Sequence, residues 1–133
     1  MTHIKILIAD DDPDDHQFIE EAIMEVDKDA TFNHVYDGFS VIGLLDSCDT
    51  HNLPDLIILD YNMPKMTGVQ VLANLFIHDR YKNIPKVIFT TSGSARQIKE
   101  CMDNGATDYF VKPGAVEDLK QFAKHVLKFC KTK

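Results

Sequence analysis

The sequence has no long apolar run and few cysteines. No segment approaches the roughly 20 apolar residues that a membrane-spanning helix needs, and Lys5 and Asp10 bound an apolar stretch too short for a signal peptide. The three cysteines, Cys48, Cys101 and Cys130, are far apart and odd in number. This spacing argues against disulfides and zinc, and favours reduced, mostly buried thiols in the cytoplasm, away from membranes.

Positive charge is also in the minority. Lysine and arginine number 14 against 21 aspartates and glutamates, for a net charge of −7, which argues against direct nucleic-acid binding. No repeat, linker or low-complexity tract divides the chain. The 133 residues, 44% hydrophobic and 26% charged, have the balance of a globular protein and predict a single domain over residues 1–133.

Five short apolar runs alternate with segments of helical apolar spacing. The predicted strands are 4–9, 31–36, 55–60, 86–91 and 107–111, and the helical stripes fall within 18–26, 69–76, 98–102 and 116–130. The first and third runs are nearly continuous in aliphatic residues, as in parallel strands buried on both faces. The second run is less apolar and suits an edge. This alternation predicts an α/β fold with a five-stranded parallel sheet and helices on both faces.

Polar residues stand where these predicted strands end. Asp10 and Asp11 follow the first strand, and the third ends in Asp60. The fourth ends in Thr90 and Thr91, and Lys112 stands at the end of the fifth. In open parallel sheets, function gathers at the carboxyl ends of the strands. Each residue alone has a commoner explanation, such as a turn, a strand position or a solvated surface. Their joint arrival at one sheet edge predicts a site.

The acidic stretch from Asp10 to Asp15 has a partly structural explanation. Asp12 suits a helix N-cap, Pro13 the first helical position, and Asp14 and Asp15 the first turn, where the helix dipole favours negative charge. Asp10 and Asp11 remain, together with Asp60. Three unpaired carboxylates would raise one another's pKa values, and a hard cation such as Mg²⁺ relieves this repulsion.

A cation, a lysine and a hydroxyl that converge on a carboxylate fit phosphoryl transfer. The three equatorial oxygens of the phosphoryl group need neutralising while an oxygen nucleophile attacks in line. Asp60 would be this nucleophile and would form an aspartyl phosphate.

The chain resembles the receiver domain of bacterial two-component response regulators, specifically the stand-alone chemotaxis type. The resemblance covers nearly the whole sequence and rests on four stretches: ILIADDDP, PDLIILDYNMPKMTG, the hydroxyl ending VIFTT, and GATDYFVKP. It implies a flavodoxin-like (βα)5 fold with strand order 2-1-3-4-5. It also implies a cytoplasmic signalling domain that is not an enzyme, apart from its own phosphotransfer and autodephosphorylation.

The resemblance further implies the roles of individual residues. Asp60 would accept the phosphoryl group from a histidine kinase or histidine phosphotransfer protein. Asp10, Asp11, Asp60 and the backbone carbonyl of Asn62 would hold Mg²⁺. Thr90, preferred to Thr91 because of its spacing to the lysine, would contact the phosphoryl oxygens together with Lys112.

Signalling would follow from a switch at Thr90 and Tyr109. Tyr109 would turn inward and alter the face formed by the fourth helix, the fifth strand and the last helix, where a downstream protein or a second copy in a homodimer would bind. Phe122 and Phe129 are either exposed on this face or packed under the C-terminus. The Lys112–Pro113 bond is expected to be cis.

Three positions depart from the commoner family pattern. Thr91 stands where a smaller residue is usual, and is expected to narrow phosphodonor access or alter the hydrolysis rate. Gly114 replaces a bulky apolar residue and should loosen its loop, and Lys65 stands in a turn where glycine is common.

Three alternatives remain open. A haloacid-dehalogenase-type phosphatase would need an acid where Asn62 stands, and a flavodoxin-like cofactor binder would not place DDDPDD in a phosphate-binding loop. The third alternative is a receiver-shaped module that no longer takes phosphate. Such proteins usually lack an acid, the hydroxyl or the lysine, all of which are present here.

Overall fold

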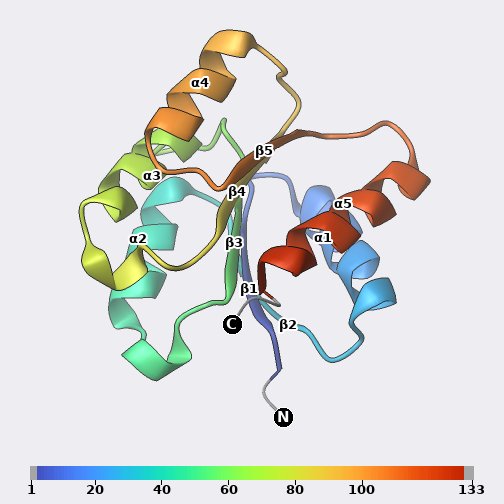
Figure 1. Ribbon diagram of the computed structural model, residues 1–133, viewed down its shortest axis with the longest axis horizontal. Coiled ribbons are helices and arrows are strands. Elements are labelled where there is room, and N and C mark those ends of the chain that lie inside the picture. The colour runs from blue at the N-terminus through green and yellow to red at the C-terminus, as the bar shows by residue number, and fades with distance from the viewer. Residues whose placement is uncertain (1–2, 131–133) are drawn as a thin grey trace.

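In a computed structural model that describes residues 3–130, one sheet stands between two layers of helices (Figure 1). All paired strands are parallel, in the order β2-β1-β3-β4-β5. The strands are β1 (Lys5–Ala9), β2 (Thr31–Val35), β3 (Leu56–Leu59), β4 (Lys86–Thr90) and β5 (Asp108–Val111). The helices are α1 (Pro13–Val26), α2 (Gly38–Ser47), α3 (Gly68–Phe76), α4 (Ala95–Asp103) and α5 (Val116–Cys130), with short 3-10 turns η1 (Thr50–Asn52) and η2 (Asp79–Tyr81). The predicted fold class, strand order and edge position of β2 are confirmed.

Each face of the sheet carries its own apolar core. Helices α1 and α5 cover one face, and α2, α3 and α4 cover the other (Figure 1). Ile6 and Ile8 of β1 pack toward α1 and α5, whereas Leu7 and Ala9 of the same strand pack toward α2 and α3. Because successive strand residues point to opposite faces, a strand with two covered faces needs apolar residues throughout.

The apolar stripes predicted for the helices are wider than the faces that the structure buries. Phe18 of α1 and Phe76 of α3 are 52% and 63% exposed, and Val26 and Met102 are exposed as well. A helix turns about 100° per residue, so residues at the margin of a stripe pass beyond the edge of the core. No apolar stripe in the sequence predicted α2, which is short and contains two glycines.

The turn from β1 into α1 forms as predicted. The Asp12 carboxylate accepts a hydrogen bond from the Asp14 backbone N–H at 2.9 Å, Pro13 opens the helix, and Asp14 and Asp15 lie in the first turn. Asp12 is therefore the N-cap. Three of the clustered acids thus have a structural role at the start of the helix, and this role does not account for Asp10 and Asp11.

Two backbone positions bear on the sequence expectations. Within residues 3–130, Lys65 alone among non-glycine residues has a positive φ, of 70°, a conformation that explains why glycine suits this turn. No peptide bond in this range is cis, so the prediction for Lys112–Pro113 was wrong. The trans isomer is lower in energy by about 0.5–1 kcal/mol, and Lys112 reaches the site with it.

The three cysteines form no disulfide. Cys101 and Cys130 are buried and Cys48 is half-buried, as expected. Burial raises the pKa of both buried thiols to about 11, so they are protonated at neutral pH. Across the described part of the chain, no helix is both long enough and apolar enough to cross a membrane.

Candidate functional site

The residues predicted at the strand ends lie together at one edge of the sheet. Asp10 and Asp60 directly follow the adjacent strands β1 and β3, and the Asp60 backbone N–H donates to the Ala9 carbonyl at 2.9 Å. On the other side of β3, the Lys112 backbone N–H donates to the Thr90 carbonyl at 2.7 Å. The strand hydrogen bonds thus extend into the site and fix where its residues emerge.

Three carboxylates form the centre of this site. One oxygen each from Asp10, Asp11 and Asp60 lies within 4.8 Å of the others. Asp10 and Asp60 are buried, at 2% and 7% exposure, whereas Asp11 is exposed. The Asp12 backbone N–H donates to Asp10 Oδ1 at 2.9 Å, which holds that carboxylate in place.

Lys112 lies among the carboxylates. Its Nζ is 2.9 Å from Asp10 Oδ2, 2.7 Å from Asp15 Oδ2 and 3.4 Å from Asp60 Oδ2, and its side chain is 13% exposed. The contact with Asp15 was missed, because helix-start preferences fully explained that residue. Asp15 lies in the first turn of α1, not at a strand end, so no signal in the sequence pointed to this contact.

The pKa values of Asp10 and Lys112 are set by burial and by the neighbouring charges. Burial raises the pKa of Asp10 from 3.8 to about 7, and Asp60 adds to this, while the hydrogen bond from Lys112 opposes it. For Lys112, burial lowers the pKa, but the hydrogen bonds to Asp10 and Asp15 outweigh burial and raise it. Lys112 is therefore a cation throughout the neutral range.

The hydroxyl of Thr90 is available for a ligand. Thr90 is 1% exposed, and its Oγ1 has no hydrogen-bond partner among residues 3–130. A buried hydroxyl without a partner is costly and is explained when a ligand supplies one. Thr91 is exposed, so of the two hydroxyls only that of Thr90 is buried.

Tyr109, the predicted switch residue, is half-buried and packs against the core on the face of the sheet that α2, α3 and α4 cover. Its hydroxyl donates to the Ser92 carbonyl at 2.6 Å, which ties β5 to the segment after β4. A second tyrosine, Tyr61, was not predicted. It directly follows Asp60 and donates to Glu100 Oε1 of α4 at 2.5 Å, a bond that raises the Tyr61 pKa to about 12.

The loop after Asp60 approaches α3 closely. A Cβ atom on Gly68 would lie 2.5 Å from the Asp60 backbone oxygen, and the Gly68 N–H donates to the Tyr61 carbonyl at 2.8 Å. Asn62 is exposed within this loop. A Cβ on Gly114 would meet nothing within 4 Å, so packing does not require glycine there.

The residues fit a hard divalent cation. Carboxylate oxygens from Asp10, Asp11 and Asp60 are the ligands that Mg²⁺ prefers, and the exposure of Asp11 leaves room for water. Histidine or cysteine ligands, which would favour zinc, do not join this cluster within the described range.

The family follows from comparison with known proteins. Residues 6–124 match the response regulator receiver domain. The chain belongs to this family. The two-component response regulator ORR8 of Oryza sativa subsp. indica is 29% identical over 126 residues, which cover 95% of this chain and 100% of that protein. The receiver is thus a signalling domain of the two-component type, and the matches do not support the phosphatase or flavin-binding alternatives.

Solved receiver structures have the same fold. The phosphorylated cyanobacterial phytochrome response regulator RcpA has a TM-score of 0.86 at 30% identity and covers 98% of this chain and 96% of its own. The Mn²⁺-bound response regulator Rcp1 has a TM-score of 0.82 at 26% identity, with 95% and 93% covered. The chemotaxis response regulator CheY4 of Vibrio cholerae has a TM-score of 0.79 at 27% identity, with 94% and 99% covered.

The raised pKa of Asp10 predicts a pH-dependent stability of the metal-free receiver. Between pH 4 and 7 the folded state retains a proton that the unfolded state has lost, so this contribution is complete below pH 3.8 and is lost as the pH rises to about 7. At about 1.4 kcal/mol per pKa unit, we expect a loss of about 2 kcal/mol between pH 5.5 and pH 8. Urea denaturation at pH 5.5 and 8, with and without Mg²⁺, measures it.

Mg²⁺ should restore stability at pH 8 more than at pH 5.5, because it binds the ionised carboxylate. The Asp10→Asn variant should lose the part of the pH dependence that is due to Asp10. Mg²⁺ should then stabilise this variant equally at pH 5.5 and pH 8. In the wild-type protein, a Mg²⁺ effect of equal size at both pH values would show that Asp10 ionisation is not linked to metal binding.

Proposed function

We propose that this receiver accepts a phosphoryl group on Asp60 from a phosphohistidine donor, with Mg²⁺ bound by Asp10, Asp11, Asp60 and the backbone carbonyl of Asn62. One observation carries the proposal. The half-buried Lys112 contacts the buried carboxylate of Asp60, two further acids beside Asp60 can hold a cation, and the strand next to Asp60 ends in a buried hydroxyl without a partner, that of Thr90. Retention of all these groups argues against a receiver that no longer takes phosphate.

Each residue has a chemical role in the transfer. A carboxylate oxygen of Asp60 attacks phosphorus, the P–N bond to the donor imidazole breaks, and that nitrogen leaves with the bonding electrons. Lys112 and Thr90 donate hydrogen bonds to the phosphoryl oxygens as charge develops on them. When bound, Mg²⁺ neutralises part of that charge. The same groups would assist hydrolysis of the aspartyl phosphate by water, which is autodephosphorylation.

Two related structures support parts of this proposal. RcpA has been observed in a phosphorylated form and Rcp1 in a Mn²⁺-bound form, each at 26–30% identity to this chain. Mn²⁺ and Mg²⁺ both prefer oxygen ligands. The phosphodonor would be a histidine kinase or a histidine phosphotransfer protein in the cytoplasm, where the unpaired cysteines would stay reduced.

We further propose that the signal leaves through the face formed by α4, β5 and α5. Phosphorylation would draw the Thr90 hydroxyl toward the phosphoryl group. Tyr109 would then break its hydrogen bond to the Ser92 carbonyl and turn into the space that Thr90 leaves. A downstream protein, or a second copy in a homodimer, would bind this face. Residues 1–133 would act as one unit, without direct contact to nucleic acid or membrane.

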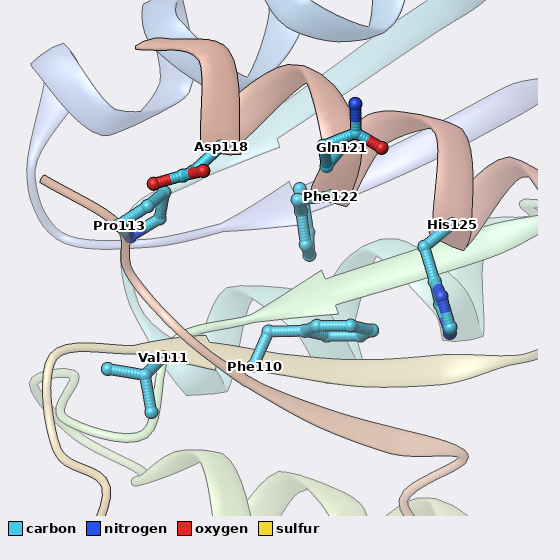
Figure 2. Close-up of a pocket in the computed structure, with 7 residues that line it drawn as sticks. All are labelled: Phe110, Val111, Pro113, Asp118, Gln121, Phe122 and His125. Atoms are coloured by element: carbon cyan, nitrogen blue, oxygen red, sulfur yellow. The ribbon is translucent and has the colours of Figure 1, made fainter. Parts of the chain in front are cut away.

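Part of this face is visible in Figure 2, where a pocket lies between β5 and α5. Phe110 meets Phe122 edge to face at 5.0 Å and lies 5.2 Å from the His125 ring. Phe122 is buried and Phe129 half-buried, so Phe122 packs under α5 instead of projecting from the face.

Intact-mass measurement tests phosphorylation directly. After incubation with Mg²⁺ and phosphoramidate, a small donor with a P–N bond, the protein should gain one base-labile phosphoryl group. Asp60→Asn should gain none. Asp79→Asn is the matched control, because Asp79 is exposed in η2, away from the site, and this variant should react like wild type. Equal labelling without a divalent metal would contradict the role of the acids, and labelling of Asp60→Asn would contradict the acceptor.

A further inference from the structure

Two histidines meet beside the backbone of Asp10. His16 of α1 and His34 of β2 face each other with their Nδ1 atoms 2.7 Å apart and their ring centroids 4.8 Å apart. His16 is 3% exposed, and the Tyr36 ring packs against it at 4.4 Å. The His34 side chain is 29% exposed on the edge strand, so solvent reaches the pair from that side.

The outer nitrogen of each ring is bonded to a group that can only accept. His16 Nε2 lies 2.8 Å from the Asp10 backbone oxygen, and His34 Nε2 lies 2.8 Å from Glu20 Oε1. A carbonyl oxygen and a carboxylate supply no hydrogen, so each Nε2 carries its own. Two neutral rings with this arrangement would point the lone pairs of both Nδ1 atoms at each other.

That geometry requires a cation between the rings. Facing lone pairs 2.7 Å apart repel, and a shared proton or a metal ion converts the repulsion into attraction. Glu20 places a negative charge beside His34, which attracts a cation to the pair. Burial lowers the pKa of His16, so this ring is a neutral ligand whose Nδ1 lone pair can bind a metal ion. The pair therefore has a fixed place for one cation.

The outer hydrogen bonds match those of metal-ligating histidines. Such rings donate their other N–H to a carboxylate or a backbone carbonyl, which fixes the tautomer and orients the lone pair toward the metal. Here Glu20 serves His34 and the Asp10 carbonyl serves His16. Imidazole nitrogens suit Zn²⁺, Ni²⁺ and Cu²⁺, and are poor ligands for Mg²⁺.

We propose that His16 and His34 form a second metal site, which binds a divalent transition ion such as Ni²⁺ or Zn²⁺ through both Nδ1 atoms. Water completes the coordination on the exposed side of His34. Zn–N bonds are about 2.0–2.1 Å, so tetrahedral coordination needs the two nitrogens roughly 3.3 Å apart. The rings must separate by about half an ångström and turn so that their lone pairs meet at an angle. The partial exposure of the His34 side chain gives it room to do so. The site is independent of phosphorylation at Asp60.

Titration of the untagged protein with Ni²⁺, followed by calorimetry in the presence of saturating Mg²⁺, tests the site. Mg²⁺ occupies the carboxylate cluster, so the remaining binding should have a stoichiometry of one. His34→Gln should weaken Ni²⁺ binding at least tenfold, while His51→Gln, which alters an exposed histidine in η1, should leave it unchanged. His34 is preferred to His16 for substitution because its partial exposure makes misfolding less of a concern.

A pair of glutamate variants adds a test that preserves both ligands. Glu20→Gln removes the carboxylate behind His34 and should weaken Ni²⁺ binding about tenfold, the range expected for such partners. Glu21→Gln, one position along and exposed, should have no effect. With Co²⁺ in place of Ni²⁺, visible absorption should report nitrogen coordination and should be lost in His34→Gln.

Two results would overturn the proposal. Absence of Ni²⁺ and Zn²⁺ binding at millimolar concentration would show that the pair holds only a proton. Binding that survives in His34→Gln but is lost in Asp11→Asn would assign the ion to the carboxylates. Neither result bears on whether Asp60 accepts phosphate.

Discussion

Lys112→Ala should destabilise the metal-free receiver by about 3 kcal/mol at pH 8, because it removes the cation from a buried group of carboxylates. Lys112 contacts Asp10, Asp15 and Asp60, and two of these three acids are buried. Without it, their repulsion has no internal compensation. The loss should be smaller at pH 5.5, where Asp10 takes up a proton instead. Urea denaturation at both pH values measures the effect.

The same variant should lower the rate of phosphorylation by phosphoramidate at least about 100-fold, the usual cost of removing one donor that stabilises developing charge. Mg²⁺ should recover stability but not rate, because it replaces the charge of Lys112 but not the hydrogen bond that we propose Lys112 donates to the phosphoryl group. Lys99→Ala is the control. Lys99 forms an exposed ion pair with Asp103 on α4, and its loss should change neither quantity. Wild-type stability of Lys112→Ala at pH 8 would show that the cluster does not need this cation.

Gly68→Ala should be the second most damaging substitution. Its Cβ would lie 2.5 Å from the Asp60 backbone oxygen and 3.0 Å from the Tyr61 Cα, and backbone atoms cannot move aside as a flexible side chain can. We expect a loss of about 3 kcal/mol from the forced backbone shift. Because the displaced atoms belong to Asp60, the proposed phosphoacceptor, phosphorylation should slow as well. Denaturation and phosphoramidate labelling measure the two effects.

Gly43→Ala provides a matched control within a helix. Nothing lies within 4 Å of a Cβ at Gly43, and alanine is the better helix former by about 1 kcal/mol. This variant should therefore gain stability and label normally. If Gly68→Ala gained stability as Gly43→Ala does, helix propensity would dominate at Gly68 and the close approach to Asp60 would not be a constraint.

The strands could be predicted because burial on both faces leaves a local signature. Runs such as ILIA and LIIL contain no polar residue, and the polar residues or proline that flank them mark where the strands end. The helices were less predictable. α2 buries Gly38, Val41 and Leu45, too short a stripe to stand out, and Phe18 and Phe76 belong by spacing to stripes that the structure leaves exposed.

The site divides in the same way. The sequence could propose five site residues because each stands at a strand end, and the topology brings strand ends together: Asp10, Asp11, Asp60, Thr90 and Lys112. Side chains that reach the site from elsewhere left no such signal. Asp15 reaches Lys112 from the first turn of α1, and Tyr61 reaches Glu100 across 39 residues of sequence. The pairing of His16 with His34 depends on the distance between α1 and β2, which spacing along the chain does not encode.

The unequal anchoring of two helices has a consequence for how the domain moves. α3 and α4 each have nine residues, but α3 buries four of them and α4 buries only Cys101. A buried aliphatic side chain contributes roughly 1.5–3 kcal/mol, so local opening of α4 should require far less free energy than opening of α3. The bond from Tyr61 to Glu100 attaches this weakly held helix to the residue beside Asp60. One or two altered contacts near Asp60 would therefore be comparable in energy to the packing that holds α4 against the sheet. The same change would be small beside the packing energy of α3.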